Sequence, residues 1–333
     1  MTEPLLSIRD LTTVVRARNQ DVVVVRDVGL DVHPGETVGL VGESGSGKSM
    51  TMLSVAGLVP SPPARVTSGT IVFEGTDLLS LGEEERRATR GSGIAMIFQD
   101  PMSSLNPLMR IGEQIVEGMR AHGTPKAEAG RRTLDVLSQV GIPEPRRAAS
   151  SYPHEFSGGM RQRVMIASAL ALEPKLLIAD EATSALDVTI QQQIVELIRK
   201  LQRETGMAVI WITHDMGVVA RIAQRVMVMY AGHIVEQAPA HRIFKSPEHP
   251  YTAGLLASIP SLDDFQRAAL RQIGGRPPDP TEVEVGCPFA PRCPQRIERC
   301  VREMPPMTER EGSARAACWV PPSEWAAERT GTS

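Results

Sequence analysis

Aromatic side chains are scarce in this chain of 333 residues, and none occurs before Phe73. Long apolar runs are missing too: the longest stretch without Asp, Glu, Lys or Arg is residues 49–64, which three prolines interrupt. A membrane-spanning helix needs ~20 mostly apolar residues, so no segment is predicted to cross a bilayer. The first ten residues lack the basic region and apolar core of a secretion signal, and we therefore expect a cytosolic protein.

An excess of charge of one sign is also missing. The chain has 36 basic and 39 acidic side chains, with a formal net charge of −3. A nucleic-acid-binding surface is normally strongly basic, so we expect no nucleic-acid partner. The apolar content of 41% and the charged content of 23% are typical of a globular protein of one large domain or two smaller ones.

Cysteine is absent from the first 286 residues, and all four cysteines lie in the last 47 (Cys287, Cys293, Cys300 and Cys318). Random placement would produce this fewer than about one time in a thousand. Fourteen of the 26 prolines lie in residues 237–333. We therefore predict a regular domain over residues 1–236 and a proline- and cysteine-rich C-terminal extension over residues 237–333.

Residues 1–236 are predicted to form a layered α/β domain, because strand-like apolar runs alternate with helical patterns. Several runs are apolar without alternation, as in a parallel sheet covered on both faces. The expected strands are residues 22–25, 37–41, 70–73, 94–98, 176–179, 208–213 and 225–229. The expected helices are residues 163–172 and 190–203, with 111–121 and 127–140 in a helical insertion over about residues 100–157.

A phosphate-binding loop is predicted at residues 42–49, which read Gly-Glu-Ser-Gly-Ser-Gly-Lys-Ser between a strand and a helix. The glycines allow backbone N–H groups to face phosphate oxygens, and the helix adds its positive N-terminal end. Lys48 would reach the β and γ phosphates, and the Ser49 hydroxyl would bind Mg²⁺. An ordinary glycine-rich turn is the alternative, but the strand–loop–helix order favours a P-loop.

A pair of carboxylates follows the apolar run Leu-Leu-Ile-Ala at residues 176–179. Successive residues at a strand end point in different directions, so the two acids can take different roles. We expect Asp180 to hold the Mg²⁺ and Glu181 to act as general base toward the attacking water.

A third motif, which reads Ser-Gly-Gly-Met-Arg-Gln-Arg, begins at Ser157 and resembles the signature sequence of ABC-type ATPases. The resemblance implies that Ser157, Gly158 and Gly159 contact the γ-phosphate bound by an opposite subunit. Two residues depart from the usual pattern, Phe156 where Leu is common and Met160 where Gln is common. Neither change affects the groups that would face phosphate.

The resemblance to ABC ATPases extends to further positions. It implies that Gln99 contacts the metal and water, that Asp187 ends a D-loop begun at Ser184, and that His214 senses the γ-phosphate. The nucleotide-binding residues that it implies around the P-loop are Gly42, Ser44, Gly45, Ser46, Gly47, Lys48, Ser49 and Met50.

The C-terminal extension narrows the resemblance to the ATP-binding subunits of dipeptide and oligopeptide importers. The features that resemble this subfamily are residues 96–107, 187–191 and 249–252 and the pattern C-x5-C-x6-C-x17-C. The resemblance implies ATP and Mg²⁺ as ligands and a second, related ATPase as heterodimer partner. It also implies two transmembrane permeases, an extracytoplasmic peptide-binding protein, and a peripheral position on the cytoplasmic face of the membrane.

Other functions remain as alternatives. Nickel, heme or glutathione could replace peptides as cargo. A non-transport ABC ATPase acting on DNA or ribosomes is disfavoured, because about 108 residues without heptads separate Ser49 from Ser157 and the chain has one cassette. A regulatory or metal-sensing protein with an inert nucleotide site is disfavoured by the intact Lys48, Asp180, Glu181 and His214.

The four cysteines form a candidate metal site, because disulfides are disfavoured in a reducing cytosol. Four thiolates can enclose Zn²⁺ or a [4Fe–4S] cluster, and the spacing, which contains no C-x2-C pair, leaves both open. The resemblance favours the [4Fe–4S] cluster. In either case the metal would stabilise an extension with little core of its own.

The scarcity of aromatic residues generates a prediction about adenine. The resemblance implies an aromatic ring near Val15 or Arg16, where this chain has none. We hypothesise that Arg16 or Arg18 covers the base with its guanidinium plane, the alternative being looser packing against Val15. Arg16→Ala or Arg18→Ala should then weaken ATP binding by about tenfold, measured by titration calorimetry. Unchanged affinity in both variants would contradict the hypothesis.

Overall fold

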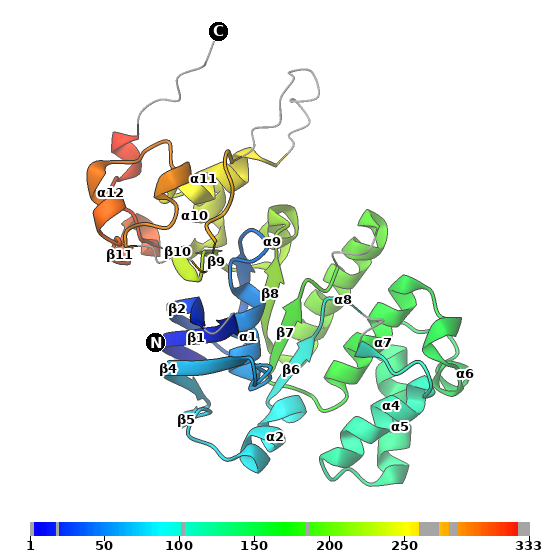
Figure 1. The fold of residues 1–333 in the computed structure, drawn as a ribbon. Helices are drawn as coiled ribbons and strands as arrows, with labels where there is room; N and C mark the ends of the chain where they lie inside the picture. The colour runs from blue at the N-terminus through cyan, green and yellow to red at the C-terminus, as the bar shows by residue number, and fades with distance from the viewer. Residues whose placement is uncertain are drawn as a thin grey trace.

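The computed structural model describes residues 3–17, 20–100, 104–183, 187–259, 273–279, 281 and 285–325. It has two sheets with helices packed around them, which confirms the α/β prediction (Figure 1). Within these ranges, no helix is both long enough and apolar enough to span a membrane.

The smaller sheet is antiparallel, with the strand order β2-β1-β4-β5. Its strands are β1 (Leu6–Ala17), β2 (Gln20–Val32), β4 (Ala64–Phe73) and β5 (Thr76–Asp77). The sequence predicted only short parts of β2 and β4, and it did not predict β1. Register shifts interrupt the pairing of β1 with both neighbours, which explains why its apolar residues do not alternate regularly.

The larger sheet has eight strands in the order β11-β12-β10-β9-β3-β8-β7-β6. The five strands from β9 to β6 are parallel, and β10, β11 and β12 pair antiparallel. Their bounds are β3 (Thr37–Val41), β6 (Ile94–Ile97), β7 (Leu176–Asp180), β8 (Ala208–Thr213), β9 (Arg225–Tyr230), β10 (His233–Pro239), β11 (Thr308–Glu309) and β12 (Arg315–Ala316). Every residue of β3, β7 and β8 is buried, as expected for strands covered on both faces.

The helices fall into three groups. Those near the sheets are α1 (Lys48–Ala56), α2 (Glu83–Ser92), α8 (Val188–Thr205) and α9 (Met216–Ile222). A helical subdomain consists of α4 (Ile111–Ala121), α5 (Lys126–Gln139), α6 (Pro145–Ser150), η1 (Pro153–Glu155) and α7 (Gly158–Leu170). The C-terminal extension contains α10 (Ala240–Lys245), α11 (Pro250–Ala257), η3 (Ala290–Arg292), α12 (Glu298–Arg302), η4 (Glu311–Ser313) and η5 (Pro322–Glu324).

The sequence located helices well where an apolar face is buried. The predicted helix at residues 111–121 coincides with α4, and α5 begins and ends one residue before the predicted range. The highly charged α2 was not predicted, because all ten of its residues are at least partly exposed and leave no apolar period to detect.

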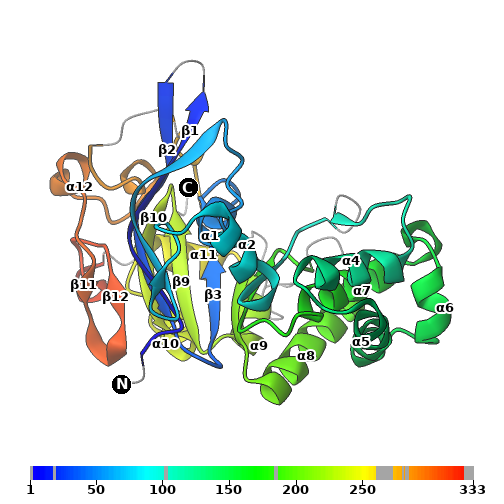
Figure 2. The same ribbon diagram turned by 90° about the horizontal axis from the view of Figure 1, so that it is seen from below.

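The C-terminal extension continues the larger sheet. Residue 236, where we expected a domain boundary, lies inside β10, and β12 of the extension pairs with β10. The extension and the helical subdomain lie on opposite sides of the molecule in both views (Figures 1 and 2). The extension and the cassette share an apolar cluster, in which Tyr230 of β9 packs against Tyr251 and Phe289 of the extension.

Two buried titratable groups, His249 in the extension and Glu236 just before it, change the stability of the fold in opposite directions as the pH changes. His249 is buried, and its Nδ1 accepts a hydrogen bond from the Tyr251 N–H at the start of α11. Burial lowers the pKa of His249 to about 3. Burial raises the pKa of Glu236 to about 7, although its carboxylate accepts hydrogen bonds from the N–H groups of Glu248 and His249.

We predict that His249→Asn reduces the acid sensitivity of the fold. As pH falls below 6.5, the unfolded chain protonates this histidine while the folded chain does not, so the wild type loses stability. Asn can still cap α11 but does not titrate. Relative to wild type, the variant should gain about 2 kcal/mol in free energy of unfolding between pH 6.5 and 5, measured by urea denaturation. The exposed His241 provides the control, His241→Asn; an equal gain in both variants would contradict the prediction.

Candidate nucleotide site

The P-loop connects β3 to α1 through three glycines with positive φ, Gly42 (155°), Gly45 (77°) and Gly47 (102°). A Cβ at Gly42 would lie 2.1 Å from the Met229 carbonyl oxygen, and one at Gly47 would lie 2.6 Å from the Val24 carbonyl oxygen. Gly47 also occupies the N-cap of α1 and brings no side chain to that helix end. The first N–H groups of α1 therefore remain available to a phosphate.

Lys48 lies across this loop and is only 5% exposed. Its Nζ donates hydrogen bonds to the carbonyl oxygens of Gly42 and Glu43, both at 2.8 Å, and to Ser46 Oγ at 3.2 Å. Burial lowers the pKa of Lys48, while the nearby carboxylates of Glu181, Asp180 and Glu43 oppose that shift. The ammonium group is thus held at the P-loop and away from water, where its attraction to a polyanion is strongest.

Of the three residues predicted to bind Mg²⁺, Ser49 and Asp180 contact each other, and Gln99 bonds to Glu181 instead. Ser49 Oγ donates a hydrogen bond to Asp180 Oδ1 at 3.0 Å. Asp180 is 7% exposed, and burial raises its pKa against the lowering effect of the Ser49 hydrogen bond. A hydroxyl and a carboxylate are the hard oxygen ligands that Mg²⁺ prefers, so these residues fit the ion.

Glu181 lies between the other two predicted catalytic residues. Gln99 Nε2 donates a hydrogen bond to Glu181 Oε2 at 2.9 Å, and His214 Nδ1 lies 3.3 Å from Glu181 Oε1. The backbone of Glu181 has a positive φ of 45°, which non-glycine residues rarely adopt. Gln99, Glu181 and His214 follow β6, β7 and β8, so the shared edge of the parallel strands brings them together.

The remaining predicted residues lie away from this group. Ser157 is the N-cap of α7 and accepts a hydrogen bond from the Met160 N–H; α7 lies in the helical subdomain, beyond β6 and β7 from α1 (Figure 1). Asp187 is the N-cap of α8 and accepts from the Ile190 N–H at 2.9 Å. Residues 184–186 of the D-loop and Arg18 lie outside the described residues, and Arg16 is exposed on β1.

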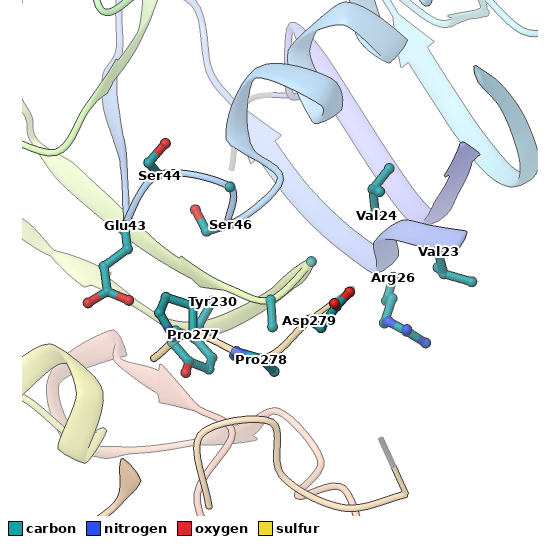
Figure 3. A pocket seen from close by; sticks show the side chains of 13 residues that line it. Val23, Val24, Arg26, Glu43, Ser44, Ser46, Tyr230, Pro277, Pro278 and Asp279 are labelled. Atoms are coloured by element: carbon teal, nitrogen blue, oxygen red, sulfur yellow. The ribbon is translucent and has the colours of Figure 1, made fainter. Parts of the chain in front are cut away.

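The sequence did not predict three residues that interact at the P-loop: Glu43 in the loop itself, and Tyr251 and Arg292 in the extension. Glu43, the second residue of the P-loop, donates its N–H to Tyr251 Oη at 2.8 Å and pairs through its carboxylate with Arg292 at 2.7 Å. A pocket there is lined by P-loop residues and by Pro277, Pro278 and Asp279 of the extension (Figure 3). The partners are 208 and 249 residues apart in sequence, so no local pattern could have revealed these contacts.

The four cysteines are all free thiols, and they lie close enough to interact electrostatically with one another. The Cys287 N–H donates to the Cys300 carbonyl oxygen at 2.7 Å, and Cys318 Sγ donates to the Val320 carbonyl oxygen. Burial raises the pKa of Cys287 to about 11 and that of Cys293 to about 12, with a smaller contribution from the neighbouring thiols.

In the positions that the structure describes, the four thiols form no metal-binding group. Among the described residues, which include all four cysteines, no group of three or more His, Cys, Asp or Glu side chains could hold one. The structure therefore gives no support to the expected [4Fe–4S] cluster or to its alternative, Zn²⁺.

Comparison with known proteins identifies the family. Residues 25–184 match the family described as ABC transporter, and residues 235–300 match the family described as oligopeptide/dipeptide transporter, C-terminal region. The dipeptide transport ATP-binding protein DppD of Bacillus subtilis (strain 168) is 49% identical over 319 residues, which are 96% of this chain and 95% of that protein. The oligopeptide transport ATP-binding protein OppD of Salmonella typhimurium (strain LT2) is 47% identical over 321 residues, 96% of this chain and 95% of that protein.

Solved structures agree with this assignment. The cbiO1 protein of Clostridium perfringens, part of the ABC transporter complex cbiONQ, superposes with a TM-score of 0.63 at 25% identity, covering 74% of this chain and 92% of that one. A dimeric ATP-binding cassette bound to ADP and Pi superposes with a TM-score of 0.63 at 27% identity, covering 71% and 98%. The chain belongs to the ATP-binding proteins of ABC transporters, in the oligopeptide/dipeptide branch, and is an ABC ATPase.

Proposed function

We propose that this chain hydrolyses ATP to drive the import of dipeptides or oligopeptides across the cytoplasmic membrane. The observation that carries the proposal is the position of Glu181, held by Gln99 and His214 beside the Ser49–Asp180 pair. The peptide cargo rests on the relatives, which are named dipeptide and oligopeptide transport ATP-binding proteins.

Each residue of the site has a different role in ATP hydrolysis. Glu181 accepts a proton from the attacking water, whose oxygen bonds to the γ-phosphorus as the bond to the β–γ bridging oxygen breaks and ADP leaves. Gln99 and His214 orient the Glu181 carboxylate and the water, and Lys48 stabilises the charge of the phosphates. Ser49 and Asp180, with Gln99 nearby, would hold Mg²⁺, which supplies further charge neutralisation when bound.

A second ATPase subunit completes the site in this proposal. Ser157, Gly158 and Gly159 begin α7 on the far side of β6 and β7 from the P-loop, so they serve an ATP bound by the partner. ATP would close a head-to-tail pair, here a heterodimer with a related ATPase, and hydrolysis would reopen it. Asp187, at the start of α8, would lie near the partner, as the D-loop position implies.

An apolar groove beside Gln99 supports a link to membrane permeases. Phe98 is 39% exposed and lines the groove with Leu105 and Met109 at the entry to the helical subdomain. Leu108, between them in sequence, is 85% exposed. We assign this groove to one of two permeases, which would place the chain on the cytoplasmic face of the membrane, with an extracytoplasmic binding protein delivering the peptide.

The test uses the whole complex in liposomes, with this chain, its partner ATPase, the permeases and a peptide-loaded binding protein. Peptide-loaded binding protein should stimulate ATP hydrolysis, and the same protein loaded with nickel, heme or glutathione should not.

Glu181→Gln should lower turnover by about a hundredfold or more while ATP still binds, because the amide cannot accept the proton. Phosphate release and retention of radiolabelled ATP measure the two effects.

The control is Glu196→Gln, which changes an exposed glutamate of α8 that pairs with Arg199. It should leave turnover unchanged. If Glu181→Gln retained the wild-type rate, the general-base role would be wrong. If ATP hydrolysis were stimulated only by binding protein loaded with another cargo, that cargo and not a peptide would be the substrate.

We also propose a metal in the extension, which the four thiols would bind only after moving from the positions that the structure describes. Their proximity and their location in one segment support it. Protein purified without oxygen should carry about four iron and four sulfide per chain if a [4Fe–4S] cluster forms, or about one zinc if the alternative holds. Elemental analysis with visible absorption distinguishes these results. Cys→Ser changes at all four positions should lower thermal stability, and full metal-free stability would contradict the proposal.

A further inference from the structure

The C-terminal extension contacts the P-loop at Glu43 through both the backbone and the side chain. The Glu43 N–H donates to Tyr251 Oη at 2.8 Å. Arg292 donates two parallel hydrogen bonds to the Glu43 carboxylate, from Nη1 at 2.7 Å and Nη2 at 3.0 Å. A bidentate pair of this kind fixes the orientation as well as the position of the carboxylate.

Arg292 is itself held firmly. Its side chain is 4% exposed, and it also donates to Tyr230 Oη and to the carbonyl oxygens of Ile273 and Gly274. The hydrogen bonds to Glu43 raise the pKa of Arg292, so the guanidinium keeps its charge. Removing one partner from such a pair leaves the other charge poorly compensated.

The negative charge of the Glu43 carboxylate lies beside the phosphate site. The Glu43 carbonyl accepts a hydrogen bond from Lys48 Nζ, and the Glu43 carboxylate interacts electrostatically with the same ammonium group. Glu43 also lines the pocket of Figure 3 together with Ser44 and Ser46 of the P-loop. A carboxylate free to turn toward Lys48 would compete with a phosphate for that cation and would repel the phosphate as well.

We propose that Arg292 is a positioning residue of the nucleotide site, which neutralises the Glu43 carboxylate and holds it away from Lys48 so that the P-loop can bind a triphosphate. The inference rests on the proposed function, since it takes the P-loop to bind ATP. The alternative is that the Arg292–Glu43 pair supports the P-loop only by fastening the extension to it, so that loss of either partner loosens the loop. The two explanations predict opposite results when Glu43 loses its charge.

The test compares Arg292→Gln, Glu43→Gln and the double variant in the full chain. Arg292→Gln should weaken binding of both MgATP and magnesium tripolyphosphate by about tenfold, because both ligands present the same phosphates. Glu43→Gln should bind both at least as tightly as wild type. The double variant should recover to within about threefold of wild type, because the competing carboxylate is gone. Titration calorimetry gives the affinities, and thermal unfolding reports the stability of each variant.

Several results would overturn the proposal. A mere fastening role predicts that Glu43→Gln weakens binding and that the double variant stays as weak as Arg292→Gln. Loss of MgATP binding without loss of tripolyphosphate binding would instead place Arg292 against the nucleoside. Because Glu43→Gln carries a prediction of its own, the test stands even if Arg292→Gln fails to fold. Arg302→Gln, in an exposed ion pair with Glu298 on α12, is the control and should change nothing. Failure of the wild type to bind MgATP would overturn the proposed function instead.

Discussion

Three adjacent parallel strands, β7, β8 and β3, are buried along their whole length, and most groups at the nucleotide site directly follow them. A buried strand must pair on both sides, because an unpaired backbone N–H or C=O away from water is costly. The strands are therefore fixed in register, with Leu40 opposite Ile212 and Asp180 opposite the same residue on the other side. Their carboxyl ends deliver the P-loop, the Asp180–Glu181 pair and His214 to one edge, while β6 adds Gln99 there.

Burial at this edge also sets the electrostatics. Lys48 and Asp180 are both removed from water, and burial disfavours the charged form of each. The loop carbonyls and Ser49 compensate in part, by hydrogen bonds of the kind that phosphate oxygens and Mg²⁺ would replace. A ligand with several negative charges, together with a divalent cation, would satisfy both buried groups at once. We therefore expect the site to bind Mg²⁺ and a triphosphate together more tightly than either ion alone.

The sequence was sufficient to predict the residues that follow strands in chain order. Glu181 was predicted from the apolar run that it follows, whereas Gln99 and His214 were predicted from the resemblance to ABC ATPases, and the structure brings the three side chains together. The sequence was insufficient for β1, whose bulges break the alternation, and for β11 and β12, which are two residues each and depend on pairing with β10. It was also insufficient for Glu43, whose partners Tyr251 and Arg292 are brought to it only by the folding of the extension. The cysteine spacing indicated that the thiols gather, but spacing alone does not determine a ligand geometry.

The extension is therefore structurally part of the cassette. Its β12 prolongs the larger sheet through β10, and β10 contains the buried Glu236, which accepts hydrogen bonds from the N–H groups that precede α11. Tyr251 on α11 then reaches Glu43, so a continuous set of contacts joins the sheet edge, the extension and the P-loop. Contacts of this kind are reciprocal: if the extension affects how the P-loop binds nucleotide, bound nucleotide must stabilise the docked extension by the same free energy. Cys293 directly follows Arg292, so we expect a change that displaces its loop to disturb the hydrogen bonds between Arg292 and Glu43 as well.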